Sequence, residues 1–422
     1  MNIDAIPTEV TTVLKRIMDK GHEAYIVGGA LRDYILNRPI QDWDIATSLL
    51  PNEIEATFND VHKVIVGKRF GTIQVFIDNT PIEITTYRTE ECYRDFRHPS
   101  NVNFTTNIYE DLKRRDFTMN SLAFNPLLDR KSFVDPYGGY QDIKNKIIRT
   151  VGNPNERFFE DPLRMMRAIR FASQLGFNID KDTLSAIDNN SKLIKNISAE
   201  RIKEELEQIL LGEFTSKAII LLYSLGIQEH IIPESRILID QSYMEYIASY
   251  IDKCSYNIVE RLCMFLIWTT KLEDRKTIIN KILKRLKYDN QTRQDVINIL
   301  STLDTPINYD LAPYFIRKTM ASIGVKNTIT MLNLKELLEC QSNNISKLKK
   351  IAFIILKENH PISRSQLEIN GHDIMKLGIG VKDERQIGQA LNMVYDWVLM
   401  EPTLNDRNIL IEKLKRHYKD KK

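Results

Sequence analysis

The spacing of apolar residues divides the chain into two parts with different expected structures. Before about residue 150, short apolar runs such as 24–27, 73–77 and 81–87 predict β-strands, and they alternate with stretches of helical spacing. From about residue 155 onward, apolar residues recur at three- and four-residue steps, as in Ile202, Leu206 and Ile209. The pattern therefore predicts an α/β head followed by an all-helical remainder.

Prolines interrupt the pattern at several places where domains could meet. A chain of 422 residues is long for one domain, so we expect two to four domains or one multi-part body. The expected joints are Asn153-Pro154, the region of Pro233, Thr305-Pro306 and Pro361.

Composition excludes several classes of protein. With 43% apolar and 27% charged residues the chain is neither disordered nor fibrous. Its longest apolar stretches, such as 218–223 and 351–356, are far shorter than the roughly 18 residues that span a bilayer. The four cysteines form no C-x-x-C pair, which argues against disulfides and zinc. No secretory signal is visible, so we expect a cytoplasmic protein without a membrane partner.

Charge is balanced overall but not locally. The net charge of +3 arises from 59 basic and 56 acidic side chains. Two runs, 271–287 and 407–422, each hold seven Lys or Arg residues against two acids. Either run could bind the phosphates of a nucleic acid, or it could be a solvated helix face.

Residues 25–33 read as a strand, a turn with Gly28 and Gly29, and the start of a helix. Such a turn can bind a phosphate, because glycines allow close approach and the helix N-terminus offers N–H donors. Arg32 adds a charged fork. A double glycine between a strand and a helix is more often only a tight turn.

Asp42-Trp43-Asp44 follows thirteen residues after Gly29. In a strand, residues two apart point to the same face about 6.7 Å from each other, so both carboxylates can face one site while Trp43 packs behind. Paired carboxylates suit Mg²⁺, and Glu83 on the predicted strand 82–85 offers a third. An isolated D-x-D can be an ordinary surface feature, but with the glycine turn it indicates nucleotidyl transfer.

Five motifs occur in a fixed order, and together they resemble one enzyme family. They are residues 28–47, 114–120, 135–139 with Asp142, 160–164, and Glu200-Arg201 with Glu205. The set resembles the class II tRNA nucleotidyltransferases, or CCA-adding enzymes, and the bacterial poly(A) polymerases. Residues 367–373 resemble the tail of that family, whereas residues 230–360 match only as generic helices.

The resemblance implies an architecture and a set of roles. It implies an α+β head of nucleotidyltransferase fold with a mixed sheet, followed by an elongated all-α neck, body and tail. The expected bounds are 1–150, 151–215, 216–350 and 351–422, with nucleotide selection in the neck and tRNA binding in the tail. Asp42 and Asp44 would hold Mg²⁺. The residues that would bind the incoming CTP or ATP are Gly29, Arg32, Arg115, Asp161, Arg164, Arg167 and Arg170.

Asp161 and Arg164 lie one helical turn apart, so they could present a shared edge. Cytosine and adenine both show an amino donor beside a ring acceptor, which a carboxylate and a guanidinium match. The alternative is that Asp161 only caps a helix in which Pro162 occupies the first turn. Arg167 and Arg170 rotate away from that edge, toward phosphates.

Asp116 could pair with arginines or a ribose hydroxyl, or form a structural ion pair. Glu200, Arg201 and Glu205 are expected to steady the Asp161 helix rather than take part in chemistry.

Features that distinguish branches of the family point in different directions. Residues 65–70 resemble the poly(A) polymerase branch, whereas Gly71-Thr72 and the segment 89–99 resemble CCA-adding enzymes. His98 and Phe70 replace an arginine and a histidine usual in that branch. We predict an enzyme that adds C, C and A to the tRNA 3′ end from CTP and ATP. The alternatives are a poly(A) polymerase, an A-adding or CC-adding relative, and an RNA-binding helical protein whose transferase head has decayed.

Overall fold

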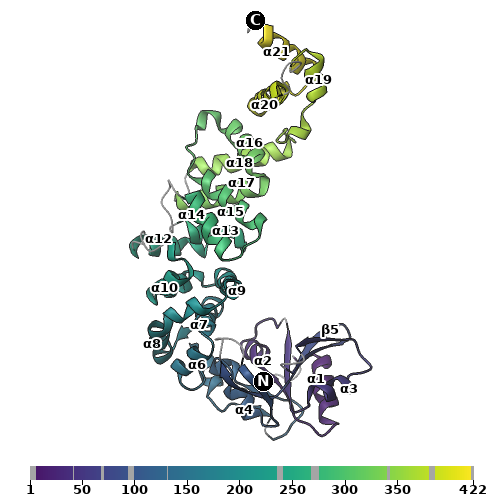
Figure 1. The fold of residues 1–422 in the computed structure, drawn as a ribbon, viewed down its shortest axis with the longest axis vertical. Helices are drawn as coiled ribbons and strands as arrows, with labels where there is room; N and C mark the ends of the chain where they lie inside the picture. Colours follow the sequence, from purple (N-terminus) through teal and green to yellow (C-terminus); the bar gives the residue numbers. More distant parts are fainter. Residues whose placement is uncertain are drawn as a thin grey trace. The chain divides into compact units, whose positions relative to one another are not determined.

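The computed structural model describes residues 6–40, 42–67, 71–93, 99–130, 132–234, 241–267, 275–339, 343–379 and 385–419. The chain divides into two compact units, Met1–Pro233 and Glu234–Lys422 (Figure 1). This division falls in the Pro233 region, one of the joints expected from the sequence. Phe70 and His98, which bear on the choice of family branch, lie outside the described residues.

The first unit contains a mixed seven-stranded sheet of order β3-β4-β5-β2-β1-β8-β9. Its strands are β1 (Ala24–Val27), β2 (Trp43–Thr47), β3 (Lys63–Gly67), β4 (Thr72–Ile77), β5 (Thr80–Thr86), β8 (Ala123–Phe124) and β9 (Phe133–Val134). The pairing of β2 with β5 is parallel and the other pairings are antiparallel. Along β5, Ile82, Ile84 and Thr86 are buried and the residues between them are partly exposed. One face of this strand therefore packs in the core, and the opposite face carries Glu83.

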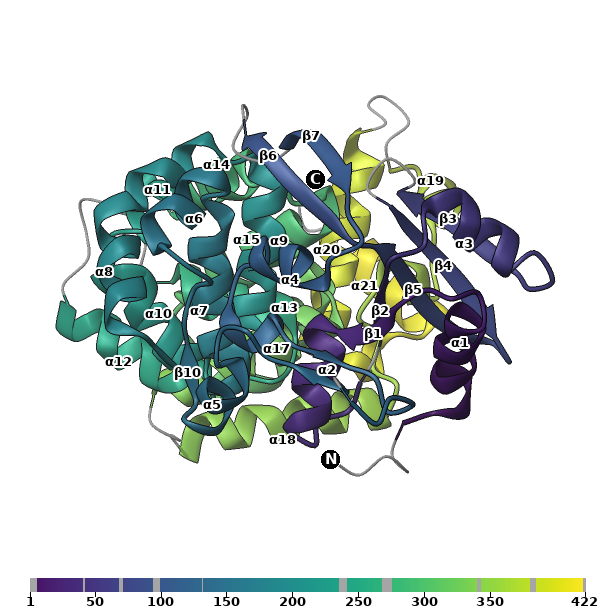
Figure 2. The same cartoon turned by 90° about the horizontal axis from the view of Figure 1, so that it is seen from below.

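Helices α1 (Thr8–Met18) and α3 (Pro51–Thr57) pack on this sheet, α1 against β1 and β2 and α3 against β4 and β5 (Figure 2). The apolar residues of α1 follow the helical period, and Val10, Val13, Leu14 and Ile17 are fully buried. A separate hairpin consists of β6 (Arg88–Tyr93) and β7 (Pro99–Phe104). Helices α2 (Gly28–Ile35), α4 (Ile108–Lys113) and α5 (Gly139–Lys144) complete the head.

The rest of the first unit is almost entirely helical, as the spacing predicts. Its helices are α6 (Pro154–Glu160), α7 (Leu163–Leu175), α8 (Lys181–Asn190), α9 (Ala199–Leu210), α10 (Thr215–Ser224) and α11 (Gln228–Ile231). Helix α7 packs against both α9 and α10. One exception to the prediction is β11 (Asn178–Ile179), which pairs in parallel with β10 (Ile147–Ile148). A two-residue strand is set by this long-range pairing and leaves no periodic signal in the sequence.

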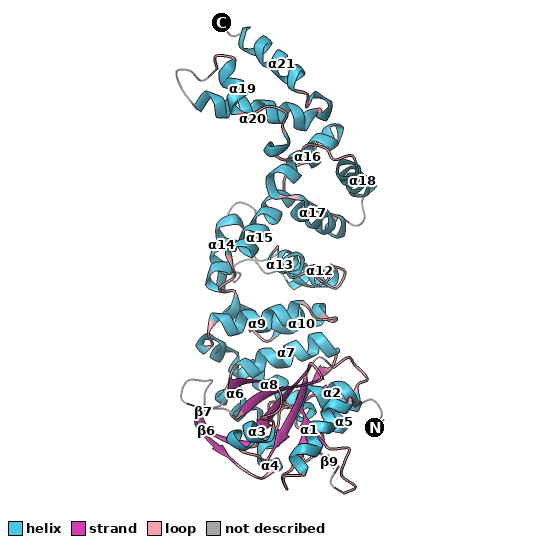
Figure 3. Cartoon of the chain, turned by 90° about the vertical axis from the view of Figure 1, so that its right-hand side faces the viewer, coloured by secondary structure: helices cyan, strands magenta, loops and turns pink. Residues whose placement is uncertain are grey.

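The described part of the second unit is helical, and all strands coloured in Figure 3 belong to the first unit. Its helices are α12 (Gln241–Ile251), α13 (Ile258–Leu266), α14 (Arg275–Arg285), α15 (Asn290–Leu303), α16 (Ala312–Ile323), α17 (Val325–Leu338), α18 (Asn343–Lys357), α19 (Gly371–Lys376), α20 (Arg385–Met400) and α21 (Arg407–Lys419). Among the helices described here, none combines the length and the apolar character needed to cross a bilayer. The α+β head with a helical remainder agrees with the fold class predicted from the sequence.

Candidate functional site

The glycine turn forms at the junction of β1 and α2, with no loop between the two elements. Gly28 has φ +67°, a backbone conformation that L side chains rarely adopt. A Cβ at Gly28 would lie 3.1 Å from Nη1 of Arg115 and 3.3 Å from Oδ2 of Asp44. The glycine therefore lets a guanidinium and a carboxylate from two other segments approach the turn.

The three predicted carboxylates lie at the start of β2 and on its neighbour β5. The parallel register pairs Asp44 with Glu83. Trp43 is buried, as the strand period predicts. Asp42 is exposed and lies one residue before β2, so the prediction that both aspartates belong to the strand is wrong for Asp42. The reason is that the pairing with β5 ends at Trp43 and Ile82.

The carboxylates influence one another electrostatically. Burial raises the pKa of Asp44 to about 6, Arg115 opposes this shift, and the charges of Glu83 and Asp42 add to it. Burial and the charge of Asp42 also raise the pKa of Glu83. A bound cation would relieve both the repulsion and the desolvation, so these oxygen donors fit a hard divalent metal. No three His, Cys, Asp or Glu side chains among the described residues already converge as a metal cluster.

The raised pKa of Asp44 predicts how stability depends on pH in metal-free protein. The folded state holds this proton more tightly than the unfolded chain, so the carboxyl stabilises the fold at low pH and loses that effect as pH rises through about 6. In the presence of a chelator, Asp44→Asn should be more stable than the parent protein by about 2–3 kcal/mol above pH 7. Thermal melts of both proteins between about pH 4.5 and 8 measure this difference. If the difference in the free energy of unfolding between Asp44→Asn and the parent protein does not change with pH, Asp44 does not have a raised pKa.

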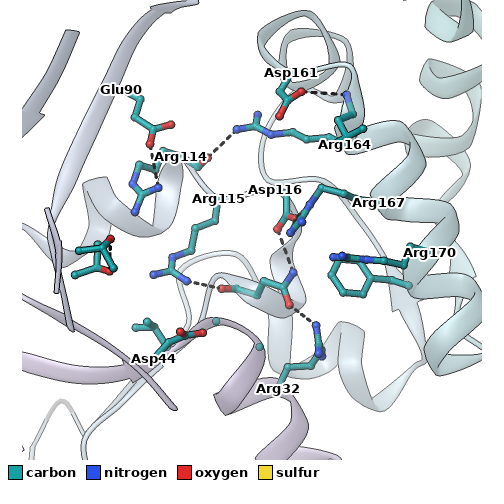
Figure 4. A pocket seen from close by; sticks show the side chains of 18 of the residues that line it. Arg32, Asp44, Glu90, Arg114, Arg115, Asp116, Asp161, Arg164, Arg167 and Arg170 are labelled. Atoms are coloured by element: carbon teal, nitrogen blue, oxygen red, sulfur yellow. Dashed lines mark hydrogen bonds and ion pairs between the residues drawn. The ribbon is translucent and has the colours of Figure 1, made fainter. Parts of the chain in front are cut away.

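A cavity of about 850 Å³ lies between the glycine turn and α7. Eight of the predicted site residues line it, namely Gly29, Arg32, Asp44, Arg115, Asp161, Arg164, Arg167 and Arg170. Asp42 and Glu83 are not among the lining residues. In Figure 4, Arg32, Asp44 and Arg115 reach the cavity from the head, and Arg164, Arg167 and Arg170 reach it from α7. The arrangement can accept a strongly anionic ligand beside a carboxylate.

The carboxylate of Asp161 accepts two hydrogen bonds from other described residues. Its Oδ1 accepts from the N–H of Leu163 at 3.1 Å, and its Oδ2 accepts from Nη2 of Arg201 at 2.7 Å. Helix α7 begins at Leu163 with Pro162 in the N-cap position, so Asp161 is one residue earlier than the expected N-cap. The carboxylate nevertheless caps the helix, because it satisfies an N–H of the first turn. The contact with Arg201 agrees with the supporting role expected for that residue.

The backbone N–H of Arg164 donates to the carbonyl of Asp161 at 3.0 Å, but its guanidinium has other partners than the Asp161 carboxylate. Its Nη1 donates to Oε2 of Glu160 at 2.6 Å and to the carbonyl of Arg157 at 3.3 Å. Its Nη2 donates to the carbonyl of Arg114 at 3.2 Å. Both Asp161 and Arg164 line the cavity.

A chain of hydrogen bonds connects the glycine turn to α7. Nη1 of Arg32 donates to Oδ1 of Asn120 at 3.0 Å, and Nδ2 of Asn120 donates to Oδ1 of Asp116 at 3.1 Å. Oδ2 of Asp116 accepts from Nη2 of Arg167 at 2.6 Å. Burial alone would raise the pKa of Asp116, but Arg167 and Asn120 hold it well below its usual range. Asp116 therefore forms a buried ion pair with Arg167, which fits both the pairing with arginines and the structural ion pair that the sequence left open.

Sequence reasoning missed several cavity residues from the segment around β6 and α4. Arg88, Glu90 and Arg114 line the cavity, and Arg114 Nη1 lies 3.2 Å from Oε1 of Glu90. Arg114 and Arg115 both pair with Asp111, at 2.7 and 3.1 Å. Arg114 and Arg115 follow Asp111 by three and four residues at the C-terminal end of α4, and this spacing is a signal from which both ion pairs could have been predicted.

Three family models match the chain. The model of the poly(A) polymerase head domain matches residues 24–149, and the model of a probable RNA- and SrmB-binding site of polymerase A matches residues 176–238. The model of tRNA nucleotidyltransferase domain 2 matches residues 257–414. The matches thus extend over the head and over most of both units.

Curated relatives match over nearly the full chain. The CCA-adding enzyme of Ligilactobacillus salivarius is 35% identical over 437 residues, which cover 100% of both proteins. The CCA-adding enzyme of Pediococcus pentosaceus is 34% identical and covers 98% of both. Among solved structures, the Bacillus stearothermophilus CCA-adding enzyme in complex with CTP has a TM-score of 0.80 at 28% identity, with 98% of each chain covered. The Thermotoga maritima CCA-adding enzyme complexed with tRNA, at 21% identity and a TM-score of 0.67 over 98% of this chain and 96% of that one, shares the fold.

Proposed function

This chain belongs to the family of CCA-adding enzymes, and we propose that the cavity between the glycine turn and α7 is the site of its reaction. The protein is a tRNA nucleotidyltransferase that adds C, C and A to the tRNA 3′ end from CTP and ATP and releases pyrophosphate. The observation that carries the assignment of the site is the convergence of Asp44 with arginines of the head and of α7 on one cavity.

Asp42 and Asp44 are the proposed ligands of a divalent metal, with Glu83 as a third carboxylate beside them. The family's reaction needs a divalent metal, and Mg²⁺ is our assignment because the donors are hard carboxylate oxygens. When bound, this metal would lower the pKa of the tRNA 3′-hydroxyl and offset charge on the leaving pyrophosphate. The raised pKa values of Asp44 and Glu83 support this choice, since burial and neighbouring carboxylates disfavour the charged forms that a bound cation would stabilise.

Triphosphate binding is assigned to Gly29, Arg32 and Arg115 in the head and to Arg167 and Arg170 in α7. The turn at Gly29 offers backbone N–H groups, and the guanidiniums offer charge and planar hydrogen-bonding forks. The arginines also stabilise the negative charge that develops on the phosphates during in-line attack.

Base selection is assigned to Asp161 and Arg164. Asp161 would accept from the amino group of C or A, and Arg164 would donate to the ring acceptor. Arg164 must redirect at least one N–H from Glu160 or the backbone carbonyls to do so. The ion pair of Arg201 with Asp161 would keep the carboxylate oriented.

Sequencing the 3′ ends made on tRNA that lacks CCA tests the whole assignment, with CTP and ATP both present. We expect tRNA that ends in CCA and stops there. A long A tract would indicate a poly(A) polymerase, and termination after CC, or addition of A only to tRNA that already ends in CC, would indicate a partial activity. No incorporation at all would indicate a binding protein with a decayed head.

The four-part organisation of head, neck, body and tail, with bounds 1–150, 151–215, 216–350 and 351–422, is also a proposal. We place the reaction in the cytoplasm because its tRNA and nucleotide substrates are there.

The tail is assigned to tRNA binding because of the two sides of α21. Leu410 and Leu414 form a buried apolar side, whereas basic residues such as Lys415 and Arg416 are exposed.

Replacing Lys415 and Arg416 together with alanine should weaken tRNA binding without altering turnover at saturating tRNA. If each side chain contacts one phosphate, the slope of log affinity against log salt should fall by about 1–2. Point substitutions are preferable to deletion of residues 407–422, which would remove the buried Leu410 and Leu414. The matched control replaces Lys15 and Lys20, two exposed lysines at the C-terminal end of α1 in the head. Equal salt slopes for the two double variants would show that α21 is merely solvated.

A further inference from the structure

One aromatic residue of the cavity, Phe171 on α7, has no role in the sequence motifs discussed above. Its ring lies beneath three arginines of the cavity. The guanidinium carbon is 4.7 Å from the ring centroid for Arg170, 5.0 Å for Arg32 and 5.6 Å for Arg167. These distances fall within the range of cation–π attraction, which extends to about 6 Å.

The ring is enclosed by protein. Phe171 is only 4% exposed. Phe117 meets it edge to face, with centroids 5.6 Å apart and ring planes at 87°. Because so little of the ring is accessible, it cannot serve as an open platform on which a nucleobase stacks. Its contacts in the cavity are with the arginines.

The three arginines repel one another and come from two different parts of the first unit. Burial and the charge of Arg167 lower the pKa of Arg170 to about 10. All three guanidiniums have carboxylate partners: Arg32 pairs with Asp33 at 2.8 Å, Arg167 with Asp116 at 2.6 Å, and Glu205 lies 3.4 Å from Arg170 and 3.8 Å from Arg167. These carboxylates lie on separate segments, so none of them holds the three cations together. Phe171 is the contact that the three share.

We propose that Phe171 is a positioning residue for nucleotide binding, whose ring holds Arg32 of the head and Arg167 and Arg170 of α7 toward one triphosphate. The ring acts through these arginines and does not itself touch the ligand. Its electron-rich face offsets part of their mutual repulsion, so the cationic cluster is assembled before the anion arrives. This inference rests on the proposed function of the cavity.

Fluorinated phenylalanines at position 171 provide the test. Stepwise fluorination withdraws electron density from the ring face and changes its shape very little, so it weakens cation–π attraction selectively. The dissociation constant for CTP, measured by equilibrium binding without tRNA, should rise with each added fluorine and reach about tenfold for the fully fluorinated ring. Affinity for tRNA should stay unchanged, and Phe171→Leu should weaken CTP binding at least as much as the fully fluorinated ring.

The same series at Phe158 is the matched control. Phe158 lies on α6, is fully buried, and is not among the residues that line the cavity. Fluorination there should leave CTP affinity unchanged. If the parent protein binds CTP but its dissociation constant does not change with fluorination at position 171, the positioning role alone is overturned. The same holds if fluorination changes the dissociation constant equally at positions 171 and 158. Failure of the parent protein to bind CTP would instead overturn the proposed function of the cavity.

Discussion

Asp44→Ala is expected to reduce every nucleotide addition by about a thousandfold or more, because it removes a metal ligand at the reacting centre. Asp42→Ala should have a comparable effect. Neither change removes core packing, since Asp42 is exposed and Asp44 is only partly buried. Incorporation of labelled CMP on tRNA lacking CCA, measured at saturating Mg²⁺, provides the readout. Thermal melts of the same samples confirm that the fold is retained.

Two further variants define the limits of this prediction. Glu83→Ala tests the third carboxylate, which pairs with Asp44 in the β2–β5 register and should also lower the rate. Asp60→Ala is the control, because Asp60 is an exposed head aspartate whose partner is Arg16 and which does not line the cavity. Substantial CMP incorporation by either the Asp42 or the Asp44 variant would refute the metal assignment.

Asp161→Asn should change which nucleotide is chosen more than it changes stability. Asparagine can still accept from the N–H of Leu163, so it caps α7 nearly as well as aspartate. The side-chain amide of asparagine can also donate a hydrogen bond. Position 161 would then no longer discriminate against bases that present an acceptor where C and A present their amino group. An unpaired buried polar group costs about 1–3 kcal/mol, and the asparagine amide would remove this cost for UTP. The ratio of kcat/KM for UTP to that for CTP should therefore rise by about tenfold or more.

The chain offers a close match for the control of that experiment. Asp180 also caps a helix, accepting from the N–H of Asp182, and also pairs with an arginine, Arg149 at 2.8 Å. It is not a cavity residue. Asp180→Asn should therefore alter neither the rate nor the nucleotide ratio. An unchanged UTP-to-CTP ratio for Asp161→Asn would leave Asp161 with a capping role only.

The sequence by itself determined the fold class and most of the candidate site. The periods of two and 3.6 residues are local properties, so they located the strands of the head and the helices that follow. The strand–turn–helix at Gly28 and the burial of Trp43 beside Asp44 also follow from local spacing. The site residues could be named because their motifs are short and occur in order along the chain. Most of the named residues line one cavity.

Only the tertiary structure decided which partners these side chains have. The parallel register of β2 and β5 places Glu83 opposite Asp44, and the docking of α7 beside the head brings Arg167 to Asp116. The guanidinium of Arg164 bonds to the carbonyl of Arg114 in the head, and the ring of Phe171 contacts not only Arg167 and Arg170 of its own helix but also Arg32 of α2. The contacts of Arg164 with Arg114 and of Phe171 with Arg32 join segments far apart in the chain. Their geometry depends on how whole elements pack, which the local periodicity of the sequence does not encode.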